Sequence, residues 1–216
     1  MNPILARKSV AVTALVGLLG MTGYVIMQPF NSLDHSLQQA IGQLQSPFLT
    51  SVMKLVSTIG NPAIVLVVMA VLAVIFWRKQ QRFESVWVLV TVIGGDFLAE
   101  IIKTITARQR PTHQLVPDTG LSFPSVHTLS AVLLVLLVLS FMTKGTQKFM
   151  VASVLGVIWI FLVALSRVYL RDHFPTDTIA AVFLGLFWWA TTAIAFRKTL
   201  LRTQANTFLL KILPQK

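Results

Sequence analysis

Residues 149–166 read FMVASVLGVIWIFLVALS, eighteen positions without an Asp, Glu, Lys or Arg. A helix needs about 20 mostly apolar residues to cross a bilayer, so this run predicts a membrane-spanning helix. Together with five further apolar stretches it predicts an all-α integral membrane protein, a six-helix transmembrane bundle in one domain over residues 1–216. The five stretches, the third of which contains Asp96 and Glu100, are Ser9–Leu33, Leu55–Trp77, Ser85–Ile105, Thr119–Thr143 and Thr178–Phe196.

Two of these stretches leave an alternative open. The first has an apolar body at Val10–Met27, which is longer than the roughly 7–15 apolar residues of a signal peptide. We therefore expect a retained anchor and not a cleaved leader. The second contains Gly60-Asn61-Pro62, which can divide it from a short helix around Pro47–Ile59.

The composition excludes several classes of soluble protein. Hydrophobic residues make up 55% of the chain and charged residues only 12%, about half of the roughly 25% that soluble domains carry. A soluble nucleic-acid-binding domain with a net charge of +11 would expose many more polar residues, so no nucleic-acid partner is expected. The chain has no cysteine, which excludes disulfides, thiolate metal sites and cysteine nucleophiles.

The distribution of the 18 cations predicts the orientation. Twelve lie at the chain ends and in the loops on the same side, and six lie on the other side. The positive-inside rule then places both termini in the cytoplasm of a multi-pass cell-membrane protein. We expect the basic tail 197–216 to lie on the inner leaflet. Residues 28–50, with Asp34 and His35, are expected to form an amphipathic or loop segment on the outer surface.

Three outer-face segments carry most of the chemistry. Residues 103–111 follow the third span, residues 123–127 begin the fourth, and residues 166–177 connect the last two. Because consecutive spans run in opposite directions, all three segments reach the same membrane face. The predicted active site is therefore extracytoplasmic.

The cations and the helix start in these segments are suited to an anion. Arg110 and Arg167 offer planar forks that match phosphate oxygens, and Lys103 offers a point charge. The fourth span begins near Pro124, so backbone N–H groups such as that of Val126 are free to bind an anion, and the Ser125 hydroxyl adds a donor. Cations that converge in a partly desolvated pocket are unfavourable without an anion.

Two histidines and a carboxylate complete the group. Asp177 lies in the first turn of the last span and can reach back to one ring N–H of His173, which orients the ring. His173 then presents its other nitrogen as a nucleophile, and His127 is free to act as general acid. The alternative, a metal site made of two histidines and one carboxylate, is disfavoured by the nearby cations, so no metal is expected.

Ten positions match, in order and spacing, the three signatures of the type 2 phosphatidic acid phosphatase (PAP2) superfamily. They are Lys103, Arg110, Pro111, Pro124, Ser125, His127, Ser166, Arg167, His173 and Asp177. The resemblance covers about residues 60–196. It implies a phosphatase without metal or cofactor that works through a phosphohistidine, with His173 as nucleophile, Asp177 as its partner and His127 as acid. Lys103, Arg110, Ser125 and Arg167 would bind phosphate. Val126 stands where the family usually has Gly, and its N–H can hold phosphate if its φ is negative.

The resemblance implies a lipid phosphate substrate among membrane lipids. Undecaprenyl diphosphate ranks first by family analogy, ahead of phosphatidylglycerophosphate and phosphatidic acid. The alternatives are phosphoryl transfer to an alcohol, a vanadate haloperoxidase, whose known examples are soluble, and a non-catalytic lipid-phosphate binder or transporter. Oligomeric state is not predicted.

Two further interpretations concern charged residues that the signatures do not explain. Arg108 and Arg171 either steer anions or bind lipid headgroups, or they have only a surface role. Asp96, Glu100 and Lys103 share one helix face, so Glu100 or Asp96 is expected to face the bundle interior and to orient Lys103.

Overall fold

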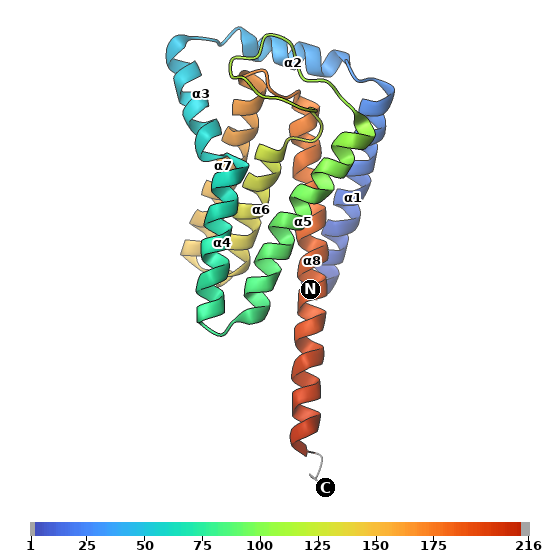
Figure 1. Cartoon of the computed structure of the whole chain (residues 1–216), viewed down its shortest axis with the longest axis vertical. Helices are drawn as coiled ribbons and strands as arrows, with labels where there is room; N and C mark the ends of the chain where they lie inside the picture. The colour runs from blue at the N-terminus through green and yellow to red at the C-terminus, as the bar shows by residue number, and fades with distance from the viewer. Residues whose placement is uncertain (1–2, 213–216) are drawn as a thin grey trace.

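The computed structural model describes residues 3–212, with side chains described for residues 4–200. Within this range the chain forms helices and no strand (Figure 1). The helices are α1 (Pro3–Met27), α2 (Ser32–Gly42), α3 (Pro47–Ile59), α4 (Pro62–Arg78), α5 (Arg82–Thr106), α6 (Val126–Ser140), α7 (Gln147–Tyr169) and α8 (Pro175–Ile212).

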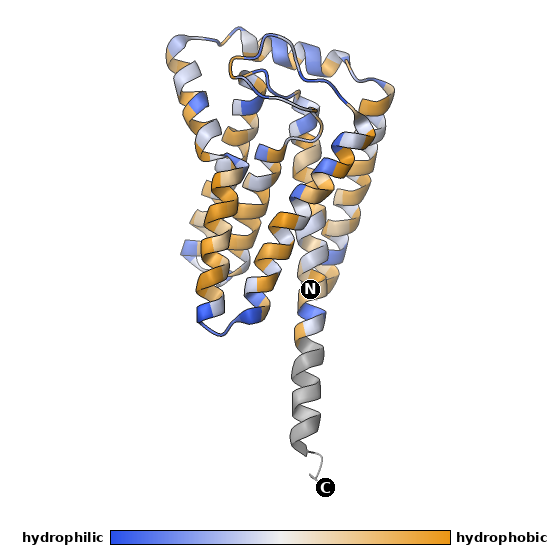
Figure 2. Cartoon of the chain, in the orientation of Figure 1, coloured by the Kyte–Doolittle hydropathy of each residue, from blue (hydrophilic) through white to orange (hydrophobic). Residues whose placement is uncertain are grey.

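Most of these helices have the length and composition of membrane spans. Five stretches of the described chain qualify, and α6 is apolar but shorter; the five are Ile4–Met27, Pro47–Arg78, Arg82–Thr106, Gln147–Tyr169 and Pro175–Leu200. Figure 2 shows apolar residues along the helices and hydrophilic ones in the turns and the segments across one end. The predicted all-helical membrane fold is confirmed, whereas the count of six spans stays a prediction.

The predicted division of the second span is confirmed, and its cause is local. Asn61 caps α4 with its side-chain oxygen, which accepts a hydrogen bond from the Ala63 N–H at 2.9 Å. Pro62 follows at the first helical position, where a missing N–H does no harm. The chain therefore stops one helix at Ile59 and begins another at Pro62, which frees α3 to tilt away from α4 (Figure 1).

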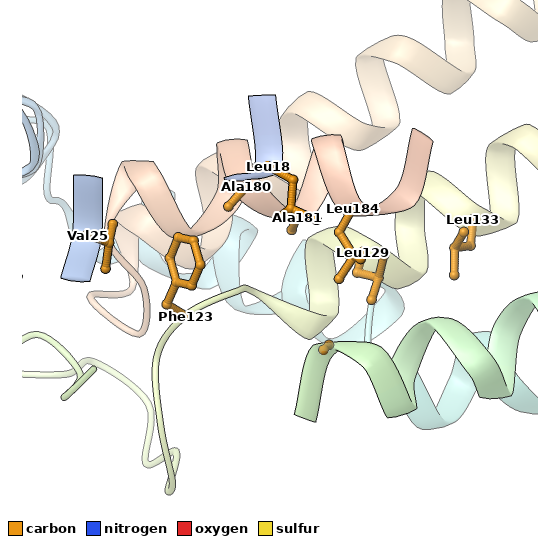
Figure 3. Packing of buried hydrophobic residues seen from close by; sticks show 9 residues of the cluster. Leu18, Val25, Phe123, Leu129, Leu133, Ala180, Ala181 and Leu184 are labelled. Atoms are coloured by element: carbon orange, nitrogen blue, oxygen red, sulfur yellow. The ribbon is translucent and has the colours of Figure 1, made fainter. Parts of the chain in front are cut away.

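The core lies where α1, α5, α6 and α8 meet. Figure 3 shows Leu18 and Val25 of α1 facing Ala180, Ala181 and Leu184 of α8, with Phe123, Leu129 and Leu133 beside them. Small residues allow this close approach, as is common between membrane helices. At Gly185 of α8 a Cβ atom would lie 2.5 Å from Val132 Cγ1, so the Val132 side chain of α6 packs directly on the backbone of α8.

The loops of interest gather at one end of the bundle. The α5–α6 and α7–α8 connections lie where α2 crosses the end of the bundle, and the start of α1 and the α4–α5 turn lie at the other end (Figure 1). The amphipathic segment predicted within residues 28–50 is present as α2. Of the basic tail 197–216, α8 continues to Ile212, residues 213–216 lie outside the described residues, and its place at the inner leaflet stays a prediction.

Candidate active site

His173 lies between Asp177, the partner that the sequence predicts for it, and Arg110, one of the predicted phosphate-binding residues. Its side chain is buried, its Nε2 lies 3.2 Å from Arg110 Nη1, and its Nδ1 lies 3.4 Å from Asp177 Oδ2. The Nδ1–Asp177 pair is within ion-pair distance but lacks hydrogen-bond geometry. A guanidinium can only donate, so Nε2 is the acceptor and the ring proton of the neutral form is on Nδ1. The lone pair on Nε2 therefore faces the arginine side of the site.

The surroundings keep this histidine neutral. Burial is the largest effect and lowers the pKa of His173 to about 4. Arg167 and Arg110 act in the same direction, while Asp177 opposes them. At neutral pH the ring is therefore an uncharged base with a free lone pair, which is the form that a nucleophile requires.

Asp177 is fixed from several sides by groups of buried residues. Its Oδ1 accepts a hydrogen bond from Arg108 Nη1 at 2.5 Å. Its Oδ2 accepts from the Phe174 N–H at 2.8 Å and from the Ser122 hydroxyl. The carboxylate is fully buried, and these donors hold it as an anion next to His173.

His127 and Arg167 face a polar pocket of about 370 Å³ beside this pair. Arg167 donates to Ser57 of α3 and to Asp118 of the α5–α6 loop, the latter at 2.7 Å. The pocket is thus lined by α3, the start of α6, the end of α7 and the three connections α3–α4, α5–α6 and α7–α8. Its lining is Lys54, Ser57, Thr58, Asn61, Val116, Pro117, Asp118, His127, Arg167, Leu170 and Asp172.

Ser125 and Val126 form the start of α6. Ser125 is the N-cap, and its buried oxygen accepts from Thr128 while its own proton remains available to donate. Val126 is the first helical residue and is not among the described residues with positive φ. The negative φ that a β-branched residue needs at this position is therefore present. The Val126 N–H is one of the unpaired donors of a helix start.

Lys103 lies in the last turn of α5 and is paired with Glu100, with Nζ and Oε1 3.0 Å apart. Of the two acids proposed to orient it, Glu100 is the one that contacts it. The expectation that Glu100 faces the bundle interior is wrong, because its side chain is 65% exposed. Glu100 thus contacts Lys103 from the exposed side of α5.

Among the described residues, no group of three or more His, Cys, Asp or Glu side chains is placed to hold a metal ion. His127, His173 and Asp177 in particular do not converge as ligands, because His127 faces the pocket and Asp177 is occupied by Arg108 and Ser122. The arrangement of two histidines and one carboxylate is therefore not formed.

Known proteins resemble this chain over most of its length. Residues 84–200 match the PAP2 superfamily, and this segment contains all ten signature positions. The chain belongs to the PAP2 superfamily. It is 30% identical over 162 residues to phosphatidylglycerophosphatase B of Bacillus subtilis (strain 168), covering 72% of this chain and 79% of that protein. It is 30% identical over 161 residues to undecaprenyl-diphosphatase of Sulfolobus acidocaldarius, covering 69% of this chain and 71% of that protein.

Solved structures show the same fold. A crystal structure of a transmembrane PAP2-type phosphatidylglycerolphosphate phosphatase from Bacillus subtilis superimposes with a TM-score of 0.74 at 21% identity, over 95% of this chain and 98% of that one. The crystal structure of Aquifex aeolicus LpxE superimposes with a TM-score of 0.63 at 19% identity, over 76% of this chain and 96% of that one. This chain is thus a membrane protein of the PAP2 lipid phosphatase family.

Two carboxylates of this PAP2 site were not foreseen from the sequence. Asp118 Oδ2 lies 2.7 Å from Arg167 Nη2 and 3.2 Å from Arg110 Nη1, so one oxygen engages both arginines. Asp172 Oδ2 lies 3.1 Å from Arg167 Nη2. Burial raises the pKa of the Asp172 carboxyl to about 6, and Arg167 opposes this effect. The arginines expected to hold phosphate are therefore already paired with acids of the protein.

The surface interpretation of Arg108 is wrong. Its side chain is only 2% exposed, and it lies between Asp177 and Asp34 of α2, both of which it contacts. Asp34 is equally buried, so the segment 28–50 does more than cover the outer surface. Arg171 is only partly exposed, with a φ of 59°.

Proposed function

We propose that this PAP2 protein hydrolyses the terminal phosphate of a membrane lipid through a phosphohistidine on His173. The observation that carries the proposal is the environment of that ring. Its Nδ1 faces Asp177 at 3.4 Å and its Nε2 faces Arg110 at 3.2 Å, at a site where a second arginine and a second histidine are close. A buried, neutral imidazole with its lone pair directed at a phosphate-binding arginine is arranged for attack on phosphorus.

The reaction divides into two steps. His173 Nε2 attacks the phosphorus, a P–N bond forms and the P–O bond to the lipid breaks. His127, protonated in the substrate complex where the phosphate charge offsets the nearby arginines, gives its proton to the leaving oxygen. Asp177 stabilises the positive ring by accepting from Nδ1–H. His127 then takes a proton from water, whose oxygen attacks phosphorus and displaces Nε2. Phosphate leaves and both histidines return to their starting state.

Arg110, Arg167, Lys103, the Ser125 hydroxyl and the Val126 N–H bind the phosphoryl oxygens in this proposal. Negative charge develops on these phosphoryl oxygens during transfer. Hydrogen-bond donors that are already fixed in place lower the barrier most. Arg110 is held by the carbonyl oxygens of Gly120 and Thr119, each at 3.1 Å. Arg167 is held by Ser57. The two forks are therefore preorganised before substrate arrives.

A lipid substrate suits the surroundings of the site. An apolar groove of about 580 Å³ runs between α6, α7 and α8, and its lining includes Val168 and Pro175. These residues are one and two positions from Arg167 and His173 in the chain. We infer that the hydrocarbon chain of the substrate lies along this groove while its phosphate enters the polar pocket.

The curated relatives are named for two substrates, phosphatidylglycerophosphate and undecaprenyl diphosphate. We propose both as candidates, with phosphatidic acid as a third. A panel of these lipids, assayed for phosphate release by the purified protein in EDTA, ranks them. Addition of an alcohol acceptor distinguishes hydrolysis from phosphoryl transfer, because transfer yields a new phosphoester at the expense of free phosphate.

The mechanism is tested with histidine variants. His173→Ala and His127→Ala are expected to abolish release, and His35→Ala, an exposed histidine of α2, serves as the matched control with full activity. Full turnover by His173→Ala would overturn the phosphohistidine. Wild-type protein that binds lipid phosphate in EDTA without turnover would instead support a binder.

The active site is proposed to face away from the cytoplasm, because the loops that form it lie opposite the more basic end. The chain has no cysteine, so single cysteines report orientation cleanly. Thr112→Cys in the α5–α6 loop should react with a membrane-impermeant maleimide in intact cells, and Lys79→Cys in the α4–α5 turn should not. The reverse labelling pattern would overturn the orientation.

A further inference from the structure

The PAP2 signatures do not include Arg108, although its side chain donates directly to the Asp177 carboxylate. Arg108 is buried, and each of its five N–H donors has an acceptor. Its Nε and Nη2 donate to the Pro29 carbonyl at 2.9 and 2.7 Å. Its Nη2 also donates to Asp34 at 2.6 Å, and its Nη1 donates to Thr176 at 2.7 Å and to Asp177 at 2.5 Å. The guanidinium thus joins the end of α1, α2 and α8.

Asp34 is the counter-charge of this arginine. Its Oδ2 also accepts from the Thr176 hydroxyl at 2.6 Å and from the Asn31 amide at 2.7 Å, and its Oδ1 accepts from the Thr176 N–H at 2.9 Å. Both oxygens are therefore satisfied and the side chain is 1% exposed. A buried charge of this kind is stable only when it keeps its opposite charge.

The charges alternate along this chain of contacts. Asp34 is negative, Arg108 is positive, Asp177 is negative, and His173 lies next to Asp177 at 3.4 Å. A carboxylate beside an imidazole favours the protonated ring, and a cation beside that carboxylate weakens the effect. The Phe174 ring lies against Arg108, with the guanidinium carbon 4.1 Å from the ring centroid, so little water screens the interaction.

We propose that Arg108 and Asp34 are positioning residues of the reaction, which together hold the Asp177 carboxylate toward His173 and set how strongly its negative charge acts on that ring. The inference rests on the proposed function, in which Asp177 orients the nucleophile. Through this pair, α2 at the end of the bundle becomes part of the catalytic unit.

The two charges should act in opposite directions. Removal of the Arg108 charge leaves Asp177 uncompensated, so His173 takes up a proton at higher pH. Removal of the Asp34 charge leaves Arg108 to offset Asp177 more strongly, so His173 takes up a proton at lower pH. The other charged or titratable groups that face His173 are unchanged by either substitution: Arg110 and Asp118 of the loop, His127 of α6, Arg167 of α7 and the neighbouring Asp172.

The experiment compares Arg108→Gln, Asp34→Asn and Thr176→Val. The last is the matched control, because it removes the hydroxyl that bonds both charged partners without a change of charge. Two readouts are used: the acid limb of kcat/KM against pH, and the NMR titration of labelled histidine, of which the chain has four. The His173 signal is assigned from its loss in His173→Ala.

We expect the His173 midpoint to rise by about one pH unit in Arg108→Gln and to fall by about half a unit in Asp34→Asn. Thr176→Val should leave it in place. Shifts of the same sign, or none, in folded variants would overturn the proposal. If Arg108→Gln does not fold, Asp34→Asn decides alone, with a downward shift in support and any other result against.

The NMR titration needs no turnover, so it separates this proposal from the proposed function. Opposite shifts in a protein that releases no phosphate would keep the positioning pair and refute the phosphatase. Phosphate release with unchanged His173 midpoints would support the phosphatase and refute the positioning pair. Arg108→Lys adds a test of geometry: it keeps the charge but loses the fork, so kcat should fall while the midpoint stays near that of the wild type.

Discussion

Asp118 is expected to compete with phosphate for the two arginines. One of its oxygens lies 2.7 Å from Arg167 and 3.2 Å from Arg110, a position at which a phosphate oxygen would bind both forks. A substrate or product phosphate therefore has to displace a carboxylate of the protein. Asp118→Asn removes the negative charge but keeps an oxygen of similar size, so the two forks should become more available to phosphate.

The magnitude follows from the two ion pairs. The Asp118 side chain is 31% exposed, and pairs at such sites are worth about 0.2–1 kcal/mol each. Loss of both charge interactions should strengthen phosphate binding by about 0.5–2 kcal/mol, which is about 2- to 30-fold in an inhibition constant. The same change should lower kcat if phosphate release limits turnover.

The assay is product inhibition by inorganic phosphate, with ³²P-labelled lipid phosphate as substrate so that added phosphate does not mask release. Glu84→Gln is the control, because it makes the same change of charge at the other end of α5, about 30 Å from Lys103 at 1.5 Å per residue. An inhibition constant in Asp118→Asn that is unchanged or weaker than that of the wild type would refute the competition. An equal decrease of the inhibition constant of phosphate in Glu84→Gln would show a general effect of net charge.

Three further predictions follow from the same contacts. The acid limb of kcat/KM should fall near pH 4, where His173 takes up a proton because burial lowers its pKa to about 4; a shallower step near pH 6 belongs to Asp172, whose pKa burial raises to about 6, and should vanish in Asp172→Asn. Glu100→Gln should raise KM about 1.5- to 5-fold, because Lys103 loses its ion pair. Unchanged kinetics in both Glu100→Gln and Asp96→Asn would show that these acids do not orient Lys103 and only contribute to packing. Gly185→Ala should lower the free energy of unfolding by about 1–3 kcal/mol, because the new Cβ meets Val132 at 2.5 Å; thermal unfolding in detergent should show no such loss for Gly20→Ala, where no atom lies within 4 Å.

The fold was predictable because local features determine it. Long runs without charge become helices in a membrane, since the backbone has no other way to satisfy its polar groups there. The helix boundaries follow the cap residues: Asn61 and Pro62 start α4, and Pro175 starts α8. The length of α6 was less predictable, because Thr119–Ser125 forms irregular backbone before the first helical turn.

The site was predictable where roles are tied to spacing. His173 and Asp177 are four positions apart at a helix start, and the structure places them together. Arg108 and Asp34 are 74 positions apart, and no spacing rule relates them. Burial of a charge depends on a partner from a distant segment. The sequence therefore shows that the charge is present but not that it is buried. One signal was present: Asp34 is the single acid among the first 83 residues of a strongly basic chain.

The paired state of the cations changes how substrate binding should be understood. Three convergent cations without an anion would be unfavourable in a desolvated pocket, and the sequence offers a substrate phosphate as the obvious remedy. In the structure the protein supplies an anion to the two arginines itself: one oxygen of Asp118 pairs with both Arg110 and Arg167. Phosphate binding is then an exchange of partners and not the filling of a bare cationic site. An exchange gives weaker affinity for phosphate but faster release of it, because an acid of the protein is ready to replace the departing product. An enzyme whose second product is free phosphate gains turnover from that arrangement, whereas a protein that only stored lipid phosphates would be weakened by it.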